Sequence, residues 1–305
     1  MPIHIPPISR RRFLAGSLAA GAGCLFSPLL PASEVAVDPN RWALLADIHI
    51  WQQRHGVHGG VKPADNLAQA VAEIVALRPR PAGMIVAGDC AFHEGRAADY
   101  AVLADLVRPI REAGIHIHFV LGNHDHRKTF WAAFPDVKPR PAAVPDKHTA
   151  IVETPRARWL LLDSLHKTND SPGWLGKPQL DWLAKTLDAR PDRPALVVAH
   201  HNPDYLHLFK GLQDVGELVG VMAPRNQAKA YVFGHSHAWS LFADQQIHMV
   251  NLPAVAWLFD KAQVRGWIDC RLLPRGAALT MQALDKKDRR HGRQVELAWR
   301  VADDA

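Results

Sequence analysis

The chain repeats one pattern of hydrophobic and polar positions five times. Each time, a short and mainly apolar run ends on a small residue, and polar side chains follow at once. The runs cover residues 42–46, 84–88, 118–122, 195–199 and 230–234. Continuous apolar runs of this length are typical of strands that are buried on both faces. The pattern therefore predicts buried strands that end at polar groups.

The polar groups that follow the five runs are mainly Asp, Asn and His. They are Asp47, His49, Asp89, Asn123, His124, Asp125, His200, His201, His235 and His237. Open α/β sheets bind ligands in the crevice outside the carboxyl ends of their strands. Five such ends in one chain therefore predict one shared polar site.

Between these runs, the spacing of apolar residues predicts helices. A helix that begins at Pro63 and another over residues 97–113 connect the first three strands. Such strand-helix-strand units make parallel, right-handed connections. Two further helices are expected at residues 127–134 and 179–187.

The second half of the chain contains mainly short strands. They are expected at residues 150–153, 158–163, 247–251, 254–258, 267–272, 277–284 and 295–301. With the helices, these strands predict an α/β fold of two packed mixed β-sheets flanked by helices, which is a four-layer αββα sandwich.

The loop at residues 50–61 follows the first strand end and is a candidate wall of the site. It contains Trp51, His55 and His58, and we interpret both histidines as exposed loop residues. Other histidines carry no motif and are interpreted as structural or without a role: His93, His116, His118, His148, His166, His207 and His248.

Composition supports a large core and disfavours two kinds of site. With 305 residues and 48% hydrophobic content, the chain can bury a sizeable core. The formal charge of +6 comes from scattered Lys and Arg. We interpret the densest basic block, residues 286–293, as a solvated loop, so no specific nucleic-acid partner is expected. The three cysteines show no metal-type spacing, so thiolate ligation is not expected either.

Residues 1–36 are typical of an export signal. Three arginines at residues 10–12 precede Phe13, a weakly apolar segment and then small residues. This order resembles a twin-arginine signal, which the twin-arginine export machinery reads on folded proteins. The apolar segment is shorter than the ~20 residues of a membrane span, so no stable membrane anchor is expected. We expect an exported, periplasmic or extracytoplasmic protein with a single domain over residues 37–305. Lipid attachment at Cys24 stays open.

The residue types at the strand ends suit two metal ions. Asp47 and His49 are two apart in an extended chain, so both side chains can reach one metal. Asp89 has two carboxylate oxygens and can bridge two cations, which lie about 3.5–4 Å apart in two-metal sites. Carboxylate, amide and imidazole groups without sulfur favour Mn, Fe, Zn or Co, as two divalent or mixed-valence ions. Such a site would keep a net positive charge and attract a phosphate ester anion.

Five blocks in this order resemble the calcineurin-like metallophosphoesterase superfamily over roughly residues 41–260. The blocks are D-x-H at residues 47–49, G-D at 88–89, G-N-H-D at 122–125, H-H at 200–201 and G-H-x-H at 234–237. Residues 122–127, followed by Phe130, are similar to the cyclic-nucleotide and glycerophosphodiester phosphodiesterase branch. The resemblance implies a binuclear metal-dependent hydrolase of small phosphate esters. It also implies a phosphodiesterase with a metal-bridging hydroxide as nucleophile.

The resemblance further implies a role for each residue. One metal would bind Asp47, His49, Asp89 and His237, and the other would bind Asp89, Asn123, His200 and His235. His124 would protonate the leaving oxygen or steady the phosphate, with Asp125 beside it as a possible partner.

Two positions depart from the family pattern. Phe92 stands three residues after Asp89, where the purple acid phosphatases have a Tyr ligand. Phe cannot ligate, which argues against that subclass. The pair His200 and His201 is followed by Asn202 and one proline in place of two prolines, which leaves open which histidine binds metal. We favour His200.

Two alternative functions stay open at this point. A phosphomonoesterase or nucleotidase would use the same site. A non-catalytic, metal-binding scaffold of the same fold would typically lack some ligands or His124, and this chain lacks none of them.

Overall fold

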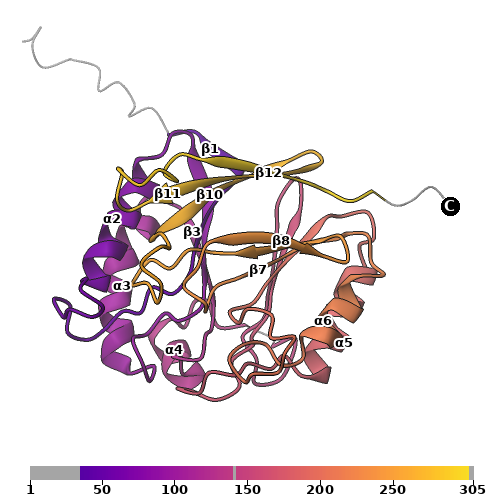
Figure 1. Ribbon diagram of the computed structural model, residues 1–305, viewed down its shortest axis with the longest axis horizontal. Coiled ribbons are helices and arrows are strands. Elements are labelled where there is room, and N and C mark those ends of the chain that lie inside the picture. The colour runs from indigo at the N-terminus through magenta and orange to yellow at the C-terminus, as the bar shows by residue number, and fades with distance from the viewer. Residues whose placement is uncertain (1–34, 140–141, 302–305) are drawn as a thin grey trace, which may run out of the picture. The chain divides into compact units, whose positions relative to one another are not determined.

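The computed structural model of the protein describes residues 35–139 and 142–301, so the predicted export signal lies almost wholly outside the described residues. From Val37 onward, the described chain forms two six-stranded β-sheets that face one another, with helices on their outer faces (Figure 1). The predicted αββα arrangement is confirmed.

The first sheet contains three parallel strands from the first half of the chain and three later antiparallel ones. Its order is β12 (Gln294–Ala298), β11 (Gly276–Ala283), β10 (Gly266–Leu273), β1 (Val37–Leu45), β2 (Arg80–Ala87) and β3 (His116–Val120). Because β1, β2 and β3 are parallel to one another, their carboxyl ends lie at the same edge of the sheet.

The second sheet is also mixed. Its order is β4 (Ala150–Glu153), β5 (Arg158–Leu161), β6 (Ala195–Val198), β7 (Ala228–Phe233), β9 (Ile247–Asn251) and β8 (Ser240–Asp244). The four central strands are parallel, whereas the edge strands β4 and β8 are antiparallel to their neighbours. The carboxyl ends of β6 and β7 are therefore adjacent.

Helices cover the outer face of each sheet. The first sheet is covered by α2 (Pro63–Ala76), α3 (Ala97–Glu112) and α4 (Arg127–Ala133), and the second by α5 (Lys177–Asp188) and α6 (Val215–Met222). Within the described part of the chain, no helix has both the length and the apolar character that a membrane crossing requires.

Alternate side chains of the central strands enter two different cores. In β1, Ala43 and Leu45 pack toward the helices, whereas Trp42 and Leu44 pack between the sheets. There Trp42 meets Trp159 of β5, with ring centroids 5.9 Å apart. Both faces of the strand are buried away from water. This explains why the run is apolar throughout and why polar residues occur only after the strand has ended.

Some elements differ from the prediction. Residues 254–258 form no strand but only one isolated parallel bridge, between Ala254 and Ala46. The backbone N–H groups of Val255 and Ala256 donate to the carbonyls of Ala46 and Asp47, just beyond the end of β1. The chain therefore crosses the end of β1 as a loop. The apolar pattern also predicts neither α6, which two glycines interrupt, nor β8, whose side chains are mostly exposed.

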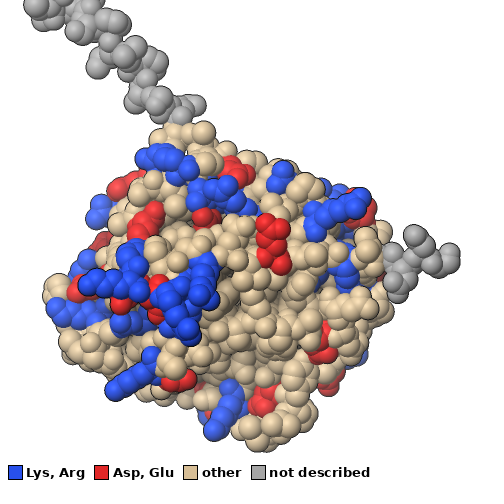
Figure 2. All heavy atoms as spheres, turned by 45° about the horizontal axis from the view of Figure 1, so that its top comes forward, with Lys and Arg blue, Asp and Glu red and all other residues tan. Residues whose placement is uncertain are grey.

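Two basic side chains of the block at residues 286–293 pair with acidic side chains. Lys286 Nζ lies 2.7 Å from a carboxylate oxygen of Glu73 in α2, and Arg290 lies 2.7 Å from one of Asp288. On the face shown in Figure 2, basic side chains gather at one side with acidic side chains among them. This pairing agrees with the interpretation of the block as a solvated loop.

A buried ion pair joins β1 to β10 and gives a test of the packing. Arg41 Nε and Nη2 donate to the two carboxylate oxygens of Asp269 at 2.8 and 2.5 Å. Without Asp269, a buried charge would have no counter-charge, so we expect Asp269→Ala to lower the free energy of unfolding by about 3–5 kcal/mol. Urea denaturation measures this loss. Asp181→Ala, which breaks an exposed pair with Lys177, is the control and should change little. Equal losses in the two variants would show that the buried pair has no special role.

Candidate metal centre

The polar groups that follow the five strands meet in one cluster. The first sheet contributes Asp47, His49, Asp89 and Asn123, and the second contributes His200, His235 and His237. Possible ligand atoms of Asp47, His49 and His237 lie within 4.8 Å of one another, and so do those of Asp47, Asp89 and His200. Apart from the half-buried His235, these side chains are buried. The structure thus brings together all seven side chains that the sequence predicts as ligands.

The backbone is bent sharply at these residues. Asp47, His49, Asp89, His235 and His237 all have positive φ, between 43° and 69°. Non-glycine residues rarely adopt this left-handed conformation, which costs of order 1–3 kcal/mol at each position. Such strain persists only where the surrounding structure enforces it, and strained residues concentrate at functional sites.

Two of the apolar runs end on a glycine, and the missing side chain leaves room for the carboxylate of a candidate ligand. A Cβ atom on Gly122 would lie 2.2 Å from Asp89 Oδ1, and one on Gly234 would lie 2.5 Å from Asp47 Oδ2. Neither position can hold a side chain without moving the carboxylate. The small residues in the sequence pattern therefore follow from the close approach of these carboxylates to the backbone.

Acceptor atoms around His200 face one another. His200 Nδ1 donates to the carbonyl of Ala87 at 2.8 Å, so Nε2 of the neutral ring is bare. His235 Nε2 donates to the carbonyl of Lys210 at 2.6 Å, so its Nδ1 is bare as well. These two bare nitrogens are 3.2 Å apart, and Asn123 Oδ1 lies 3.2 Å from His200 Nε2. Lone pairs that point at one another repel unless a cation lies between them, so these residues fit a metal ion.

A second set of the same kind surrounds His237. Its Nδ1 donates to the carbonyl of Trp257 at 2.7 Å, which leaves Nε2 of the neutral ring bare. This atom lies 3.1 Å from His49 Nε2 and 3.5 Å from Asp47 Oδ1. No hydrogen bond among the described residues fixes the tautomer of His49, whose Nδ1 has no partner. The three side chains still place two imidazoles and a carboxylate within 4.8 Å of one another, which fits another metal ion.

Asp89 belongs to both sets. Its Oδ2 atom lies 3.6 Å from His49 Nε2 and 3.3 Å from His200 Nε2. Its Oδ1 atom accepts the backbone N–H of His124 at 2.9 Å, which holds the carboxylate in place. An oxygen that faces both sets is suited to bridge two cations.

Burial and neighbouring charges set the protonation of this cluster. Burial lowers the pKa of His235 to about 3 and that of His237 to about 4, so both rings are neutral near pH 7 and can bind a cation. Burial also acts to lower the pKa of His200, but the carboxylates of Asp89 and Asp47 and the carbonyl of Ala87 together outweigh it and raise this pKa to about 9. The two carboxylates therefore favour a positive charge here, which a proton on His200 or a metal ion can supply.

In the set around His237, burial favours the neutral form of the acid Asp47 and of the base His49. It raises the pKa of Asp47 to about 7 and lowers the pKa of His49 well below its ordinary value. A neutral His49 has a lone pair for a metal, and a bound cation would favour the ionised form of Asp47.

His201 faces a different partner from His200. Its Nδ1 lies 2.8 Å from Ser164 Oγ, and its ring packs closely on Gly173. One of its ring nitrogens still lies within 4.8 Å of ligand atoms of His200 and His235. The position of His200 beside Asp89 favours His200 as the ligand, and this assignment stays a prediction.

The structure corrects the role expected for Asp125. Its buried carboxylate accepts the backbone N–H groups of Cys90, Ala91 and Gly122 and the hydroxyl of Tyr100, at 2.9–3.1 Å. These donors occupy both carboxylate oxygens, and none of them is the imidazole of His124. Asp125 therefore joins the segments that follow β2 and β3 and does not orient His124.

The partner of His124 is the backbone of His93. His124 Nδ1 donates to the His93 carbonyl at 2.9 Å, and the two rings stack with centroids 5.3 Å apart. Both side chains line the cavity above the cluster, so the interpretation of His93 as having no place in the site was wrong. No sequence signal marks this contact, because a backbone carbonyl is present at every residue.

A cavity of about 870 Å³ opens above the cluster, and aromatic side chains form its walls. Trp51 stacks on Phe92 with ring centroids 4.7 Å apart, and His58 packs against Trp257 at 4.2 Å. The predicted wall at residues 50–61 is confirmed for Trp51. His58 is exposed as expected, yet it also lines the cavity.

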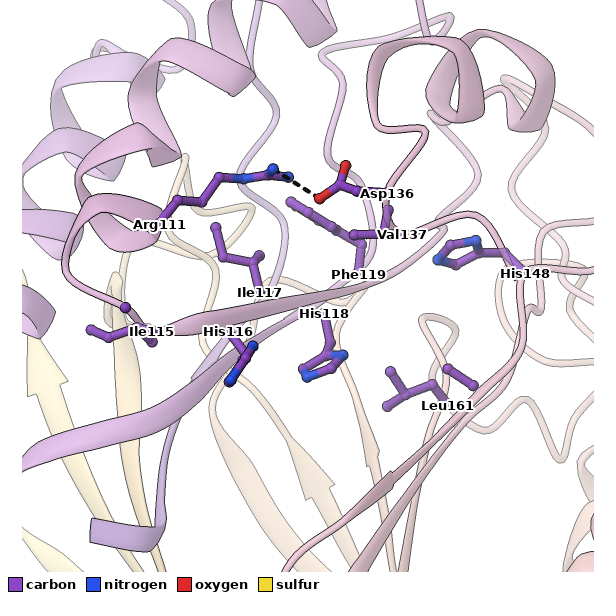
Figure 3. Close-up of a pocket in the computed structure, with 12 residues that line it drawn as sticks. Arg111, Ile115, His116, Ile117, His118, Phe119, Asp136, Val137, His148 and Leu161 are labelled. Carbon is purple, nitrogen blue, oxygen red and sulfur yellow. Dashed lines mark hydrogen bonds and ion pairs between the residues drawn. The ribbon is translucent and has the colours of Figure 1, made fainter. Parts of the chain in front are cut away.

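A second cavity, of about 530 Å³, lies beside β3 and away from the predicted ligands (Figure 3). His116, His118 and His148 line it, and Arg111 pairs there with Asp136 at 2.8 Å. Among the described residues, no group of metal-ligating side chains falls in this cavity. These three histidines thus stay with their structural interpretation.

Fold and cluster together define a class of protein. A two-metal ligand set at the strand ends of an αββα sandwich, beneath an open cavity, is the arrangement of a metal-dependent hydrolase. The family model described as calcineurin-like phosphoesterase matches residues 41–239. The chain therefore belongs to the calcineurin-like phosphoesterase family, a family of binuclear metal-dependent phosphoesterases, and it is a hydrolase of phosphate esters.

Two relatives come from the phosphodiesterase branch that the sequence pattern predicts. The glycerophosphodiester phosphodiesterase GpdQ of Enterobacter lignolyticus is 26% identical over 218 residues, which cover 70% of this chain and 76% of that protein. The 3',5'-cyclic adenosine monophosphate phosphodiesterase CpdA of Escherichia coli K12 is 31% identical over 201 residues, which cover 63% of this chain and 68% of that protein.

Two solved structures share the fold. A dimetal phosphatase from Danio rerio has a TM-score of 0.67 and 14% identity, with 86% of this chain and all (100%) of that chain covered. A purple acid phosphatase from Lupinus luteus has a TM-score of 0.57 and 10% identity, with 85% of this chain and 53% of that chain covered. At these identities the likeness concerns the fold alone.

The shared position of Asp89 predicts how metal content depends on the two carboxylates. Asp89→Ala should lose both metals, because only a bridging carboxylate contacts two cations and offsets their repulsion. Asp47→Ala should mainly weaken the binding of one of the two metals. Elemental analysis of the purified variants measures this difference, and two full equivalents of metal in the Asp89 variant would contradict the assignment.

Proposed function

We propose that the protein is a phosphodiesterase that holds two divalent metal ions on the seven side chains of the cluster. The observation that carries the proposal is the set of acceptor atoms that face one another at 3.1–3.6 Å around Asp89. The relatives named as glycerophosphodiester and cyclic adenosine monophosphate phosphodiesterases support a diester substrate. A non-catalytic scaffold would not need the complete ligand set together with His124 and an open cavity.

The donor set favours Mn, Fe, Zn or Co, because it combines imidazole with carboxylate and amide oxygen. Bound there, the two ions would neutralise charge on the phosphate and lower the pKa of a water molecule toward neutrality. In the overall reaction, water adds to phosphorus and one P–O ester bond breaks, so the products are a phosphomonoester and an alcohol.

His124 is placed to supply the proton that the leaving oxygen needs. Its Nδ1–H is engaged by the His93 carbonyl, so Nε2 remains for the substrate in the cavity. The backbone N–H of His124 also holds Asp89 Oδ1, which couples its position to the bridging carboxylate. A protonated Nε2 would donate to the ester oxygen as the P–O bond breaks.

We therefore expect His124→Ala to keep its metals but to discriminate between leaving groups. Without general-acid catalysis, the rate of hydrolysis of a dialkyl phosphodiester should fall roughly 10²–10⁴-fold, because its alkoxide is a poor leaving group. The loss on bis(p-nitrophenyl) phosphate should be much smaller, because nitrophenolate leaves without a proton. Steady-state kinetics on both substrates, with His116→Ala as a control distant from the site, measure the difference. Equal losses on the two substrates would remove His124 from the acid role.

We also propose that the protein is exported by the twin-arginine pathway. The support is the order of Arg10, Arg11 and Phe13 before a weakly apolar segment, which lies outside the described residues. That pathway carries folded proteins, so the two metals would be bound before export.

Replacing both arginines tests the export proposal. The double variant Arg10→Lys and Arg11→Lys should leave the precursor in the cytoplasm, because the pathway reads the arginine pair itself. Arg12→Lys is the matched control and should be exported normally. Cell fractionation followed by immunoblotting locates each variant, and unimpaired export of the double variant would refute the proposal.

A further inference from the structure

Several exposed apolar side chains lie in the cavity above the metal ligands or on a loop beside it. Two of them, Val57 and Phe259, line the cavity, and three more belong to the loop between the cavity residues Asn202 and Lys210. We call them the apolar rim: Val57, Leu206, Leu208, Phe209 and Phe259. Leu206 is 78% exposed, Phe259 70% and Phe209 61%. Exposed apolar surface beside a cavity is a mark of a binding site.

The apolar rim continues the lining of the cavity. Val57 and Phe259 line the cavity themselves. Asn202 and Lys210 line it as well, so the loop between these two residues begins and ends at the cavity. Leu206, Leu208 and Phe209 all belong to that loop. The rim therefore lies partly in the cavity wall and partly on a loop whose two ends are at the cavity.

The loop is built to hold its apolar side chains outward. The carboxylate of Asp204 accepts the backbone N–H groups of Leu208 and Lys210, both at 3.0 Å, and the side-chain amide of Gln213 at 2.8 Å. Phe209 has a φ of 56°, which is strained for an aromatic residue. Such a conformation persists only where the surrounding structure enforces it, and here the bonds to Asp204 hold the loop in place.

The charge of the loop fits a molecule with an apolar part and an anionic part. Between Asp204 and Asp214 the chain contains His207 and Lys210 but no acidic residue. The carboxylate of Asp204 is itself turned inward onto its three donors. The outward face is therefore apolar with one basic side chain, Lys210, next to a cavity whose floor would carry two metal ions.

We propose that the substrate is an amphiphilic phosphodiester, with its phosphate at the metal centre and a single hydrocarbon chain across the apolar rim. This inference rests on the proposed phosphodiesterase function. Water adds to phosphorus, one P–O ester bond breaks, and the leaving oxygen takes a proton, so the hydrocarbon chain stays on one of the two products. The continuity of the rim with the cavity favours the chain of the substrate itself over a separate protein or a membrane surface.

A series of alkyl p-nitrophenyl phosphodiesters with methyl, butyl and octyl chains tests the inference. All three share one leaving group, and each is used below the concentration at which it forms micelles. For the wild-type protein with its metals bound, kcat/KM should rise at least roughly 10-fold from the methyl to the octyl ester. A fully buried methylene contributes up to about fourfold, and a chain on an open rim is only partly buried.

Two rim variants and one control make the test specific. The double variant Leu206→Ser and Phe209→Ser should lose most of the octyl-to-methyl ratio of kcat/KM, and Val57→Ser should lower it independently. Ile151→Ser is the control, since Ile151 is an exposed apolar residue on β4, at the opposite edge of the second sheet from β8. It should keep the wild-type ratio. Thermal unfolding of each variant confirms that it is folded.

The outcomes separate the inference from the function on which it rests. No hydrolysis of the methyl ester by the wild type would overturn the phosphodiesterase proposal, and the inference with it. Hydrolysis at the same kcat/KM for all three chains would overturn the inference alone. The inference alone would also be overturned if the rim variants lost binding to phosphatidylglycerol vesicles but kept the wild-type octyl-to-methyl ratio of kcat/KM. The rim would then contact a membrane surface and not the substrate.

Discussion

Repulsion among the acceptor atoms around Asp89 is the constraint on which the rest of the site depends. His200, His235 and His237 each donate one ring N–H to a backbone carbonyl, and this bond directs the other nitrogen toward the carboxylates. The protein thus holds several electron-rich atoms closer together than they would remain by themselves. A proton on His200, whose pKa is raised to about 9, can relieve part of this repulsion, and metal ions can relieve more.

Such a cluster requires a rigid support, which the two facing sheets provide. Strands β1 and β2 are buried on both faces, with alternate side chains in separate cores, so their ends cannot move freely. The left-handed residues Asp47, His49 and Asp89 follow directly on these strands. Strain of about 1–3 kcal/mol at each position is tolerable only because extensive burial on both sides offsets it. The buried core is therefore part of the metal centre as well as of the fold.

Above the metal centre, the cavity changes from polar at its floor to aromatic at its walls, and exposed apolar side chains lie at its wall and on the loop beside it. Phe92 stacks on Trp51 and forms part of the wall, at the position where a ligating Tyr would define another subclass. The loop from Asn202 to Lys210 is held by the carboxylate of Asp204 with its apolar side chains in solvent. This gradient of polarity bears on the choice of substrate, whereas the cluster below determines the chemistry.

The sequence by itself determined the central strands, most of the helices, the αββα class and the set of candidate ligands. It could do so because an apolar run that stops at polar residues is a local pattern. Only the tertiary structure decided that Asp125 braces two loops, that the His93 carbonyl orients His124, and that residues 254–258 cross the end of β1 as a loop. These contacts join distant segments through backbone N–H and carbonyl groups, which every residue possesses, so no residue type in the sequence marks them.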